Sequence, residues 1–137
     1  MSGNKFGKAS KERLDTVDPL LQDVIEYALS ISHIDFGIPN LGGKRTSEEQ
    51  CKLFRQSLSK CDGISLMSKH QSGLAVDVVA YVNGGYTYEK EYYYMIYAAV
   101  MIAANYYKVK IRWGGDWDGD LNLRDQSFND LCHFEMA

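Results

Sequence analysis

The sequence predicts a single α+β domain in which a small, mostly antiparallel sheet is flanked by helices. Three observations support this prediction. The length of 137 residues suits one domain. The composition, 45% hydrophobic and 24% charged, is that of an ordinary globular protein. Helical and strand patterns follow one another irregularly, without an internal repeat or a linker.

The first part of the sequence predicts two helices and a short strand. Apolar residues at helical spacing predict a helix near 11–17, with Ser10 as its cap, and a longer one over 19–31. Pro19 divides them because proline is tolerated in the first turn of a helix and not in its interior. We expect a strand over 34–38.

A third helix should begin at Thr46, since Glu49 three residues later completes a capping-box pattern. We expect it to end near Ser59. Its predicted buried side consists of Cys51, Leu53, Phe54 and Leu58.

The second half contains one long apolar run and a long helix. The β-branched segment 74–82 predicts a central strand, and the tyrosine- and alanine-rich segment 90–109 predicts a helix. A short strand over 111–113, an acidic loop over 114–129 and a closing strand over 131–136 complete the chain.

Asp77 is the most informative residue, because it is a lone carboxylate inside the apolar run. A buried charge must meet a cation, a set of hydrogen-bond donors or a functional cleft, so a structural ion pair and a functional site both remain open. His70 lies seven residues earlier, and Gly73 can supply a bend that brings the two side chains together. Imidazole and carboxylate are both zinc ligands. His133 in the closing strand is the better candidate for a third ligand, and His33 is interpreted as a surface residue or as a core residue with satisfied hydrogen bonds.

Two motifs resemble the zinc peptidases of bacterial cell walls. Ser-x-His-x-x-Gly-x-Ala-x-Asp spans Ser68 to Asp77, and Asp-x-x-His spans Asp130 to His133. The family includes D-alanyl-D-alanine carboxypeptidases and dipeptidases and, among small phage proteins, L-alanyl-D-glutamate endopeptidases that act as endolysins. The resemblance implies their fold, the D-Ala-D-Ala peptidase or Hedgehog-like zinc peptidase fold. It extends to Phe6–Leu14, to Gly43–Thr46 with Gln50, and to Trp113–Trp117.

Carried over residue by residue, the resemblance implies one zinc ion per chain held by His70, Asp77 and His133. Asp130 would be the catalytic carboxylate. Arg45 would lie in the substrate cleft, where it could bind a substrate carboxylate or stabilise the developing oxyanion. Among the other motif residues, Ser68 is expected to contact substrate.

The spacing of Asp130 and His133 raises a geometric question. In an unbroken strand these residues would point to opposite faces, so we expect the strand to begin after Asp130, which would then lie in the preceding turn. Glu135 shares the face of His133 and is the second candidate for the catalytic base, although a supporting or solvent-facing role suits it better.

Carboxylates at alternate positions, Asp116, Asp118 and Asp120, begin the acidic loop as they would begin a calcium loop. The match to an EF-hand loop is incomplete, because Leu121 and Ser127 stand where it has glycine and glutamate. A solvated acidic loop is the preferred interpretation, with bound calcium as the alternative.

The predicted function is that of a zinc-dependent peptidoglycan endopeptidase, a phage endolysin that cuts the L-alanyl-D-glutamyl bond of stem peptides during host lysis. The alternatives are a D-alanyl-D-alanine carboxypeptidase or dipeptidase with the same zinc site, and a non-catalytic wall-binding module. We expect residues 1–137 to form one monomeric peptidase domain without a separate wall-binding domain.

The remaining expectations concern partners and compartment. A net charge of −3 gives no basic field for nucleic acid or an anionic membrane. The longest uncharged stretch, 92–104, is shorter than the roughly 20 residues that cross a bilayer. The first residues carry no signal peptide, so the protein should stay in the host cytoplasm until a holin releases it to the cell wall. Cysteines 51, 61 and 132 should be reduced.

Overall fold

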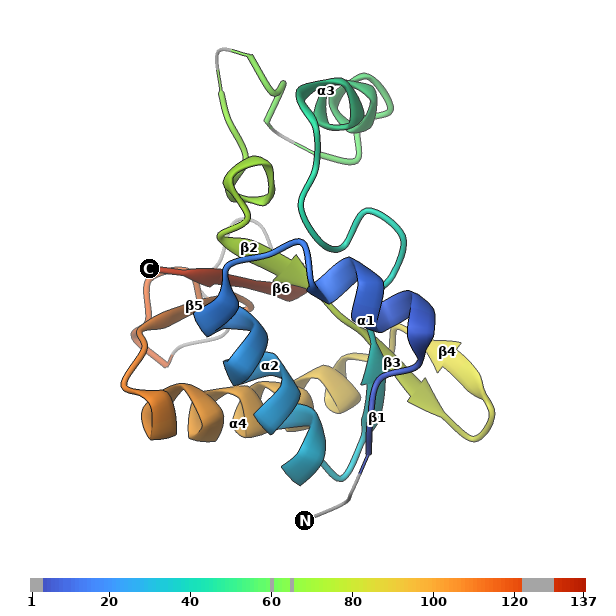
Figure 1. The fold of residues 1–137 in the computed structure, drawn as a ribbon, viewed down its shortest axis with the longest axis vertical. Coiled ribbons are helices and arrows are strands. Elements are labelled where there is room, and N and C mark those ends of the chain that lie inside the picture. Colours follow the sequence, from blue (N-terminus) through green and yellow to red (C-terminus); the bar gives the residue numbers. More distant parts are fainter. Residues whose placement is uncertain (1–3, 60, 65, 122–129) are drawn as a thin grey trace.

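The computed structural model describes residues 4–59, 61–64, 66–121 and 130–137. Within them the chain forms an α+β fold with two antiparallel three-stranded sheets, as the predicted fold class requires (Figure 1). The helices are α1 (Lys8–Leu14), α2 (Pro19–Ile31), α3 (Ser47–Arg55), the 3₁₀ helix η1 (Lys69–Ser72) and α4 (Lys90–Tyr107). The strands are β1 (Asp35–Gly37), β2 (Ala75–Asp77), β3 (Val79–Val82), β4 (Gly85–Thr87), β5 (Ile111–Gly114) and β6 (Asp130–Met136).

The prediction of one central strand over 74–82 is wrong, because this segment supplies a strand to each sheet. β2 pairs with β6 in the order β2-β6-β5, whereas β3 pairs with β1 in the order β1-β3-β4. Val78 lies between the two strands, and its N–H donates to Cys132 O at 2.9 Å. β4 was not predicted. It follows a tight turn in which Asn83 and Gly84 adopt φ values of 53° and 83°.

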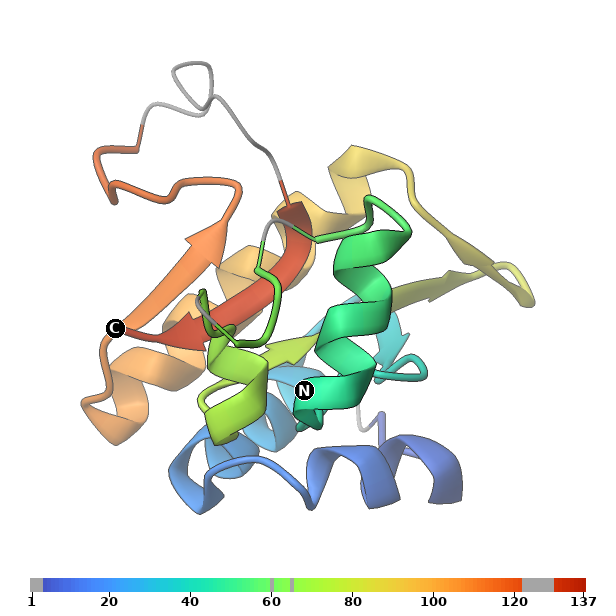
Figure 2. The same ribbon diagram turned by 90° about the horizontal axis from the view of Figure 1, so that it is seen from above.

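The two longest helices pack against each other and form the layer below sheet β2-β6-β5 (Figure 1). Apolar residues of both helices and of the sheets share one core. η1 and α3 lie on the other side of this sheet, above it in Figure 1 and toward the viewer in Figure 2. The sheet therefore separates the apolar core from the segment that carries His70.

Tyr93 connects α4 to the second sheet. Its ring is 2% exposed, and its hydroxyl donates to Thr87 O at 2.8 Å and accepts from Ala80 N at 3.1 Å. One side chain thus satisfies backbone groups on both β3 and β4, which fixes the sheet relative to the helix.

The predicted start of α2 is confirmed, and the predicted start of α1 is wrong. α2 begins at Pro19, as expected, and Asp18 caps it by accepting from Leu20 N at 2.9 Å. The prediction of Ser10 as a cap is wrong, because α1 begins at Lys8. The Ser10 hydroxyl instead accepts from Ile38 N at 3.0 Å. It therefore joins α1 to the segment after β1 rather than to its own helix.

The capping box of α3 is confirmed, with hydrogen bonds in both directions between Thr46 and Glu49. The helix ends earlier than expected, at Arg55, and its predicted buried side is wrong. Phe54 and Leu58 are 46% and 69% exposed, and Gln50 is the only residue of α3 that is buried. The reason is the position of α3, which lies over the polar face of the sheet and not against the apolar core (Figure 2).

The remaining elements lie near their predicted positions. α4 ends at Tyr107 and is followed by Lys108 in the left-handed conformation. The described part of the acidic loop ends at residue 121, so the expectation for residues 122–129 lies outside the described residues. The three cysteines are free. Among the described helices, none has the length and apolar character needed to cross a membrane.

Candidate metal centre

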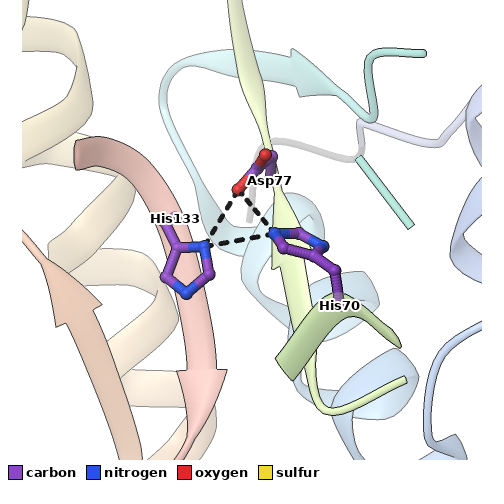
Figure 3. Close-up of side chains that lie close together, drawn as sticks. All are labelled: His70, Asp77 and His133. Carbon is purple, nitrogen blue, oxygen red and sulfur yellow. Dashed lines mark hydrogen bonds and ion pairs between the residues drawn. The ribbon is translucent and has the colours of Figure 1, made fainter. Parts of the chain in front are cut away.

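Three side chains from three separate elements meet on the polar face of sheet β2-β6-β5 (Figure 3). His70 lies in η1, Asp77 ends β2, and His133 lies opposite Asp77 in β6. The distances His70 Nε2–Asp77 Oδ1, His133 Nδ1–Asp77 Oδ1 and His70 Nε2–His133 Nδ1 are each 3.2 Å. The structure therefore brings together the three predicted ligands.

The triangle has the dimensions of a zinc site. Donor atoms bound to zinc at 2.0–2.1 Å in a tetrahedron lie about 3.3 Å from one another. The three distances match this spacing, and two nitrogens with one carboxylate oxygen form a donor set that zinc prefers. Three protein ligands leave a fourth position for water or substrate, which is the arrangement of catalytic zinc sites.

Each histidine is oriented by a partner on its other ring nitrogen. His70 Nδ1 lies 3.0 Å from Gly43 O, and His133 Nε2 lies 2.8 Å from Glu135 Oε1. Because a carbonyl and a carboxylate only accept hydrogen bonds, these nitrogens carry a proton, so that each imidazole in its neutral form, the form that binds a metal, presents the lone pair of His70 Nε2 or His133 Nδ1. The supporting role expected for Glu135 agrees with this contact.

The electrostatics of the cluster favour a positive charge at its centre. Burial works to raise the pKa of the Asp77 carboxyl, but hydrogen bonds from His133 and His70 outweigh it and hold the pKa well below its ordinary value. Burial works to lower the pKa of His133, but hydrogen bonds with Asp77 and Glu135 raise it to about 9. The carboxylates therefore stabilise a proton on His133, and a bound cation can replace that charge.

Arg45 contacts two of the three candidate metal ligands. Its Nη2 donates to Asp77 Oδ2 at 3.0 Å, its Nη1 donates to Gln50 Oε1 at 3.1 Å, and its Nε donates to Leu41 O at 2.8 Å. Its backbone N–H also donates to His70 O at 2.9 Å. The structure thus places Arg45 beside the site, as expected, with its guanidinium directed at the second oxygen of Asp77.

Asp130 also lies beside the site. Ligand atoms of Asp77, Asp130 and Cys132 lie within 4.8 Å of one another, and the Cys132 thiol donates to Asp130 Oδ1 at 3.1 Å. Burial and the nearby carboxylates of Asp77 and Asp130 raise the pKa of the Cys132 thiol far above its ordinary value, so it keeps its proton. Sequence reasoning missed this contact, because a lone cysteine gives no signal of its neighbours.

The expected turn at Asp130 is not found, because Asp130 is the first residue of β6 and pairs with Gly114. The strand is irregular, however. Its register against β5 shifts between Trp113, which pairs with Phe134, and Gly114. This irregularity breaks the strict alternation of side chains and allows Asp130 and His133 to approach the same site.

Ser68 and three residues that were not predicted as site residues, Trp113, Trp117 and His33, differ in their surroundings. The Ser68 hydroxyl accepts from His70 N at 3.2 Å and caps η1. Trp113 is buried, whereas the Trp117 ring lies 5.4 Å from the ring of His133. His33 is exposed at the end of α2, as expected of a surface residue.

In the acidic loop, Asp116 differs from its neighbours. Ligand oxygens of Asp116, Asp118 and Asp120 lie within 4.8 Å of one another. Asp116 is only 4% exposed, and its Oδ1 has no hydrogen-bond partner among the described residues. Burial and the neighbouring carboxylates raise the pKa of Asp116. Asp116 is therefore not solvated, in contrast to the predicted solvated loop.

Comparisons with known proteins agree with the geometry. The family model for phage L-alanyl-D-glutamate peptidase matches residues 1–137. The L-alanyl-D-glutamate peptidase of Escherichia phage T5 is 33% identical over 123 residues, which cover 89% of this chain and 88% of that protein. The crystal structure of the Serratia marcescens L-Ala D-Glu endopeptidase ChiX superimposes with a TM-score of 0.80 at 33% identity, covering 97% of this chain and 90% of that one. The chain therefore belongs to the phage L-alanyl-D-glutamate peptidase family.

Proposed function

We propose that this protein is a zinc-dependent endopeptidase that hydrolyses the L-alanyl-D-glutamyl bond of peptidoglycan stem peptides. The observation that carries the proposal is the triangle of His70 Nε2, Asp77 Oδ1 and His133 Nδ1, with each side 3.2 Å. The bond follows from the family and from the activities named for the phage T5 and Serratia marcescens relatives.

In this proposal His70, Asp77 and His133 hold one zinc ion per chain. When bound, zinc lowers the pKa of a coordinated water from about 15.7 toward about 7 and polarises a carbonyl group. Gly43 O and Glu135 keep the two imidazoles in the tautomers that present a lone pair to the metal. Arg45 occupies the remaining oxygen of Asp77, so that Oδ1 faces the histidines.

Asp130 acts as the general base and then as the general acid. Its Oδ1 already accepts the Cys132 thiol proton, so Oδ2 is the oxygen that takes a proton from the attacking water. The same oxygen returns the proton to the amine that leaves when the peptide bond breaks. The proximity of the Asp130 carboxylate to Asp77 supports this role.

Arg45 and Ser68 are assigned to substrate binding. Three of the five N–H donors of the Arg45 guanidinium have partners, which leaves two for a substrate carboxylate or for the oxyanion of the transition state. The Ser68 hydroxyl accepts from His70 N, so its own proton is available to a peptide carbonyl.

The test is digestion of purified peptidoglycan and of defined stem peptides, with the fragments identified by mass spectrometry. Cleavage that frees the amino group of D-glutamate supports the proposal. Release of a terminal D-alanine would instead show the D-alanyl-D-alanine carboxypeptidase or dipeptidase alternative. Binding to the wall without any fragment would show a non-catalytic module.

The cellular role follows from the reaction. We propose that the protein acts as a monomer and a single peptidase domain that degrades the wall during host lysis. It would accumulate in the host cytoplasm and reach peptidoglycan after a holin opens the membrane. Expression in bacteria with and without a holin tests this: lysis should require both proteins.

A further inference from the structure

Gln50 is the one residue of α3 that is completely buried, although its side chain is polar. Both N–H groups of its amide and one of the two lone pairs of its oxygen have hydrogen-bond partners among the described residues. Its Oε1 accepts from Arg45 Nη1 at 3.1 Å, and its Nε2 donates to Ser59 Oγ and to Cys61 O, both at 2.7 Å. Because arginine can only donate and a carbonyl can only accept, the amide has just one orientation that satisfies both sides.

The contact with Gln50 restrains the Arg45 guanidinium. Leu41 O holds Nε at 2.8 Å and Gln50 holds Nη1, so Nη2 is the group that reaches Asp77 Oδ2. If the guanidinium were free to rotate, it could also approach Oδ1, the oxygen that lies 3.2 Å from both histidines. A fixed cation at Oδ2 orients the carboxylate, whereas a mobile cation would compete with a metal for Oδ1.

We propose that Gln50 is a positioning residue for the metal centre, which acts by holding Arg45 against the outer oxygen of Asp77. This inference rests on the metal site of the proposed function. Groups that orient metal ligands from outside typically contribute 10–100-fold to metal affinity. The same range is expected for Gln50, which is linked to Asp77 Oδ2 by two successive hydrogen bonds through Arg45.

Two substitutions separate the contact with Arg45 from the contacts with the loop. Gln50→Met keeps the volume of the side chain and removes all three hydrogen bonds. Gln50→Glu keeps an acceptor for Arg45 Nη1 but offers no N–H to Ser59 or Cys61. Action through Arg45 predicts that zinc affinity falls in Gln50→Met and stays near the wild-type value in Gln50→Glu, even if both variants melt at a lower temperature.

Thr46→Ala is the matched control. It removes the cap of the same helix, and so destabilises that helix, without removing any hydrogen bond of the Arg45 side chain. A second comparison uses Arg45→Met. If Gln50 works through Arg45, adding Gln50→Met to that variant should weaken zinc binding no further.

The measurement is the zinc dissociation constant by competition with a chromogenic chelator, on protein shown to be folded by circular dichroism. We expect a 10–100-fold increase for Gln50→Met and no change for Thr46→Ala. An unchanged constant in Gln50→Met, an equal loss in Gln50→Glu, or additive losses with Arg45→Met would overturn the inference. Failure of the wild-type protein to bind zinc would instead refute the proposed function.

Discussion

Replacing Asp130 by asparagine tests the assignment of the catalytic base. Asparagine has almost the same shape and can still accept the Cys132 thiol proton, but it cannot take a proton from water. General acid–base catalysis contributes about 10²–10⁴-fold to a rate, which corresponds to roughly 3–5 kcal/mol of the barrier. Because Asp130 lies outside the 3.2 Å triangle of ligands, zinc should remain bound.

The assay compares the turnover of a defined stem peptide by the wild-type protein and by Asp130→Asn, with the zinc content of each sample measured in parallel. We expect kcat to fall by about 10²–10⁴-fold at one zinc per chain. Asp23→Asn, at an exposed position on α2, is the control for a lost carboxylate and should keep full activity. If Asp130→Asn were as active as the wild type, another group would be the base, and Glu135 would be the next to test.

Three further substitutions test the surroundings of the site and the fold. Glu135→Gln should weaken zinc binding by about 10–100-fold, measured by chelator competition, because His133 loses a charged partner; an unchanged affinity would show that this contact does not orient the ligand. Tyr93→Phe should lower the free energy of unfolding in urea by about 1–3 kcal/mol, since two backbone groups lose a partner. A loss near zero would contradict the role of the Tyr93 hydroxyl in joining α4 to β3 and β4. Folding raises the pKa of Asp116, so the ionised carboxylate destabilises the fold once the pH has risen through that pKa. Asp116→Asn carries no charge and should therefore melt at a higher temperature than the wild type at neutral pH in EDTA, and a lower melting temperature would contradict this. Repeating the melt with calcium tests the calcium alternative.

The convergence of His70, Asp77 and His133 could be predicted from the sequence, because one of them violates a local rule and the other two belong to motifs. Asp77 is a charge within an apolar run, and such a residue needs a partner from elsewhere in the chain. His70 and His133 belong to short motifs with fixed spacing. Their convergence depends on the pairing of β2 with β6, which places Asp77 opposite His133. The motifs thus identified the residues, and the strand register brings them together.

The groups that orient the ligands could not be predicted in the same way. Gly43 contributes a backbone carbonyl, which any residue would supply, and Gln50 was named only as part of the motif that carries the family resemblance, without a role. The amphipathic pattern failed because α3 buries Gln50 next to the Arg45 side chain, whereas Phe54 in the helix and Leu58 after it are exposed. Periodicity shows which face is apolar, but it does not show which face is covered when the neighbouring surface is polar.

The split of segment 74–82 has a similar cause. Most residues in the run favour a strand, and the local sequence gives no sign that the partners change at Val78. The exchange of partners is a tertiary feature, set by β6 on one side and β1 on the other. Continuous β propensity therefore predicted the strand conformation correctly and the sheet topology incorrectly.

The most direct test of the account is to remove metal from the purified protein with a chelator and to titrate zinc back while measuring stem-peptide hydrolysis. The wild-type protein should lose its activity and recover it in proportion to zinc, up to one ion per chain, and His70→Ala should neither retain zinc nor recover. Hydrolysis that persists in the metal-free protein, or a His70→Ala variant that binds zinc as tightly as the wild type, would contradict the central claim that these three side chains form the catalytic metal centre.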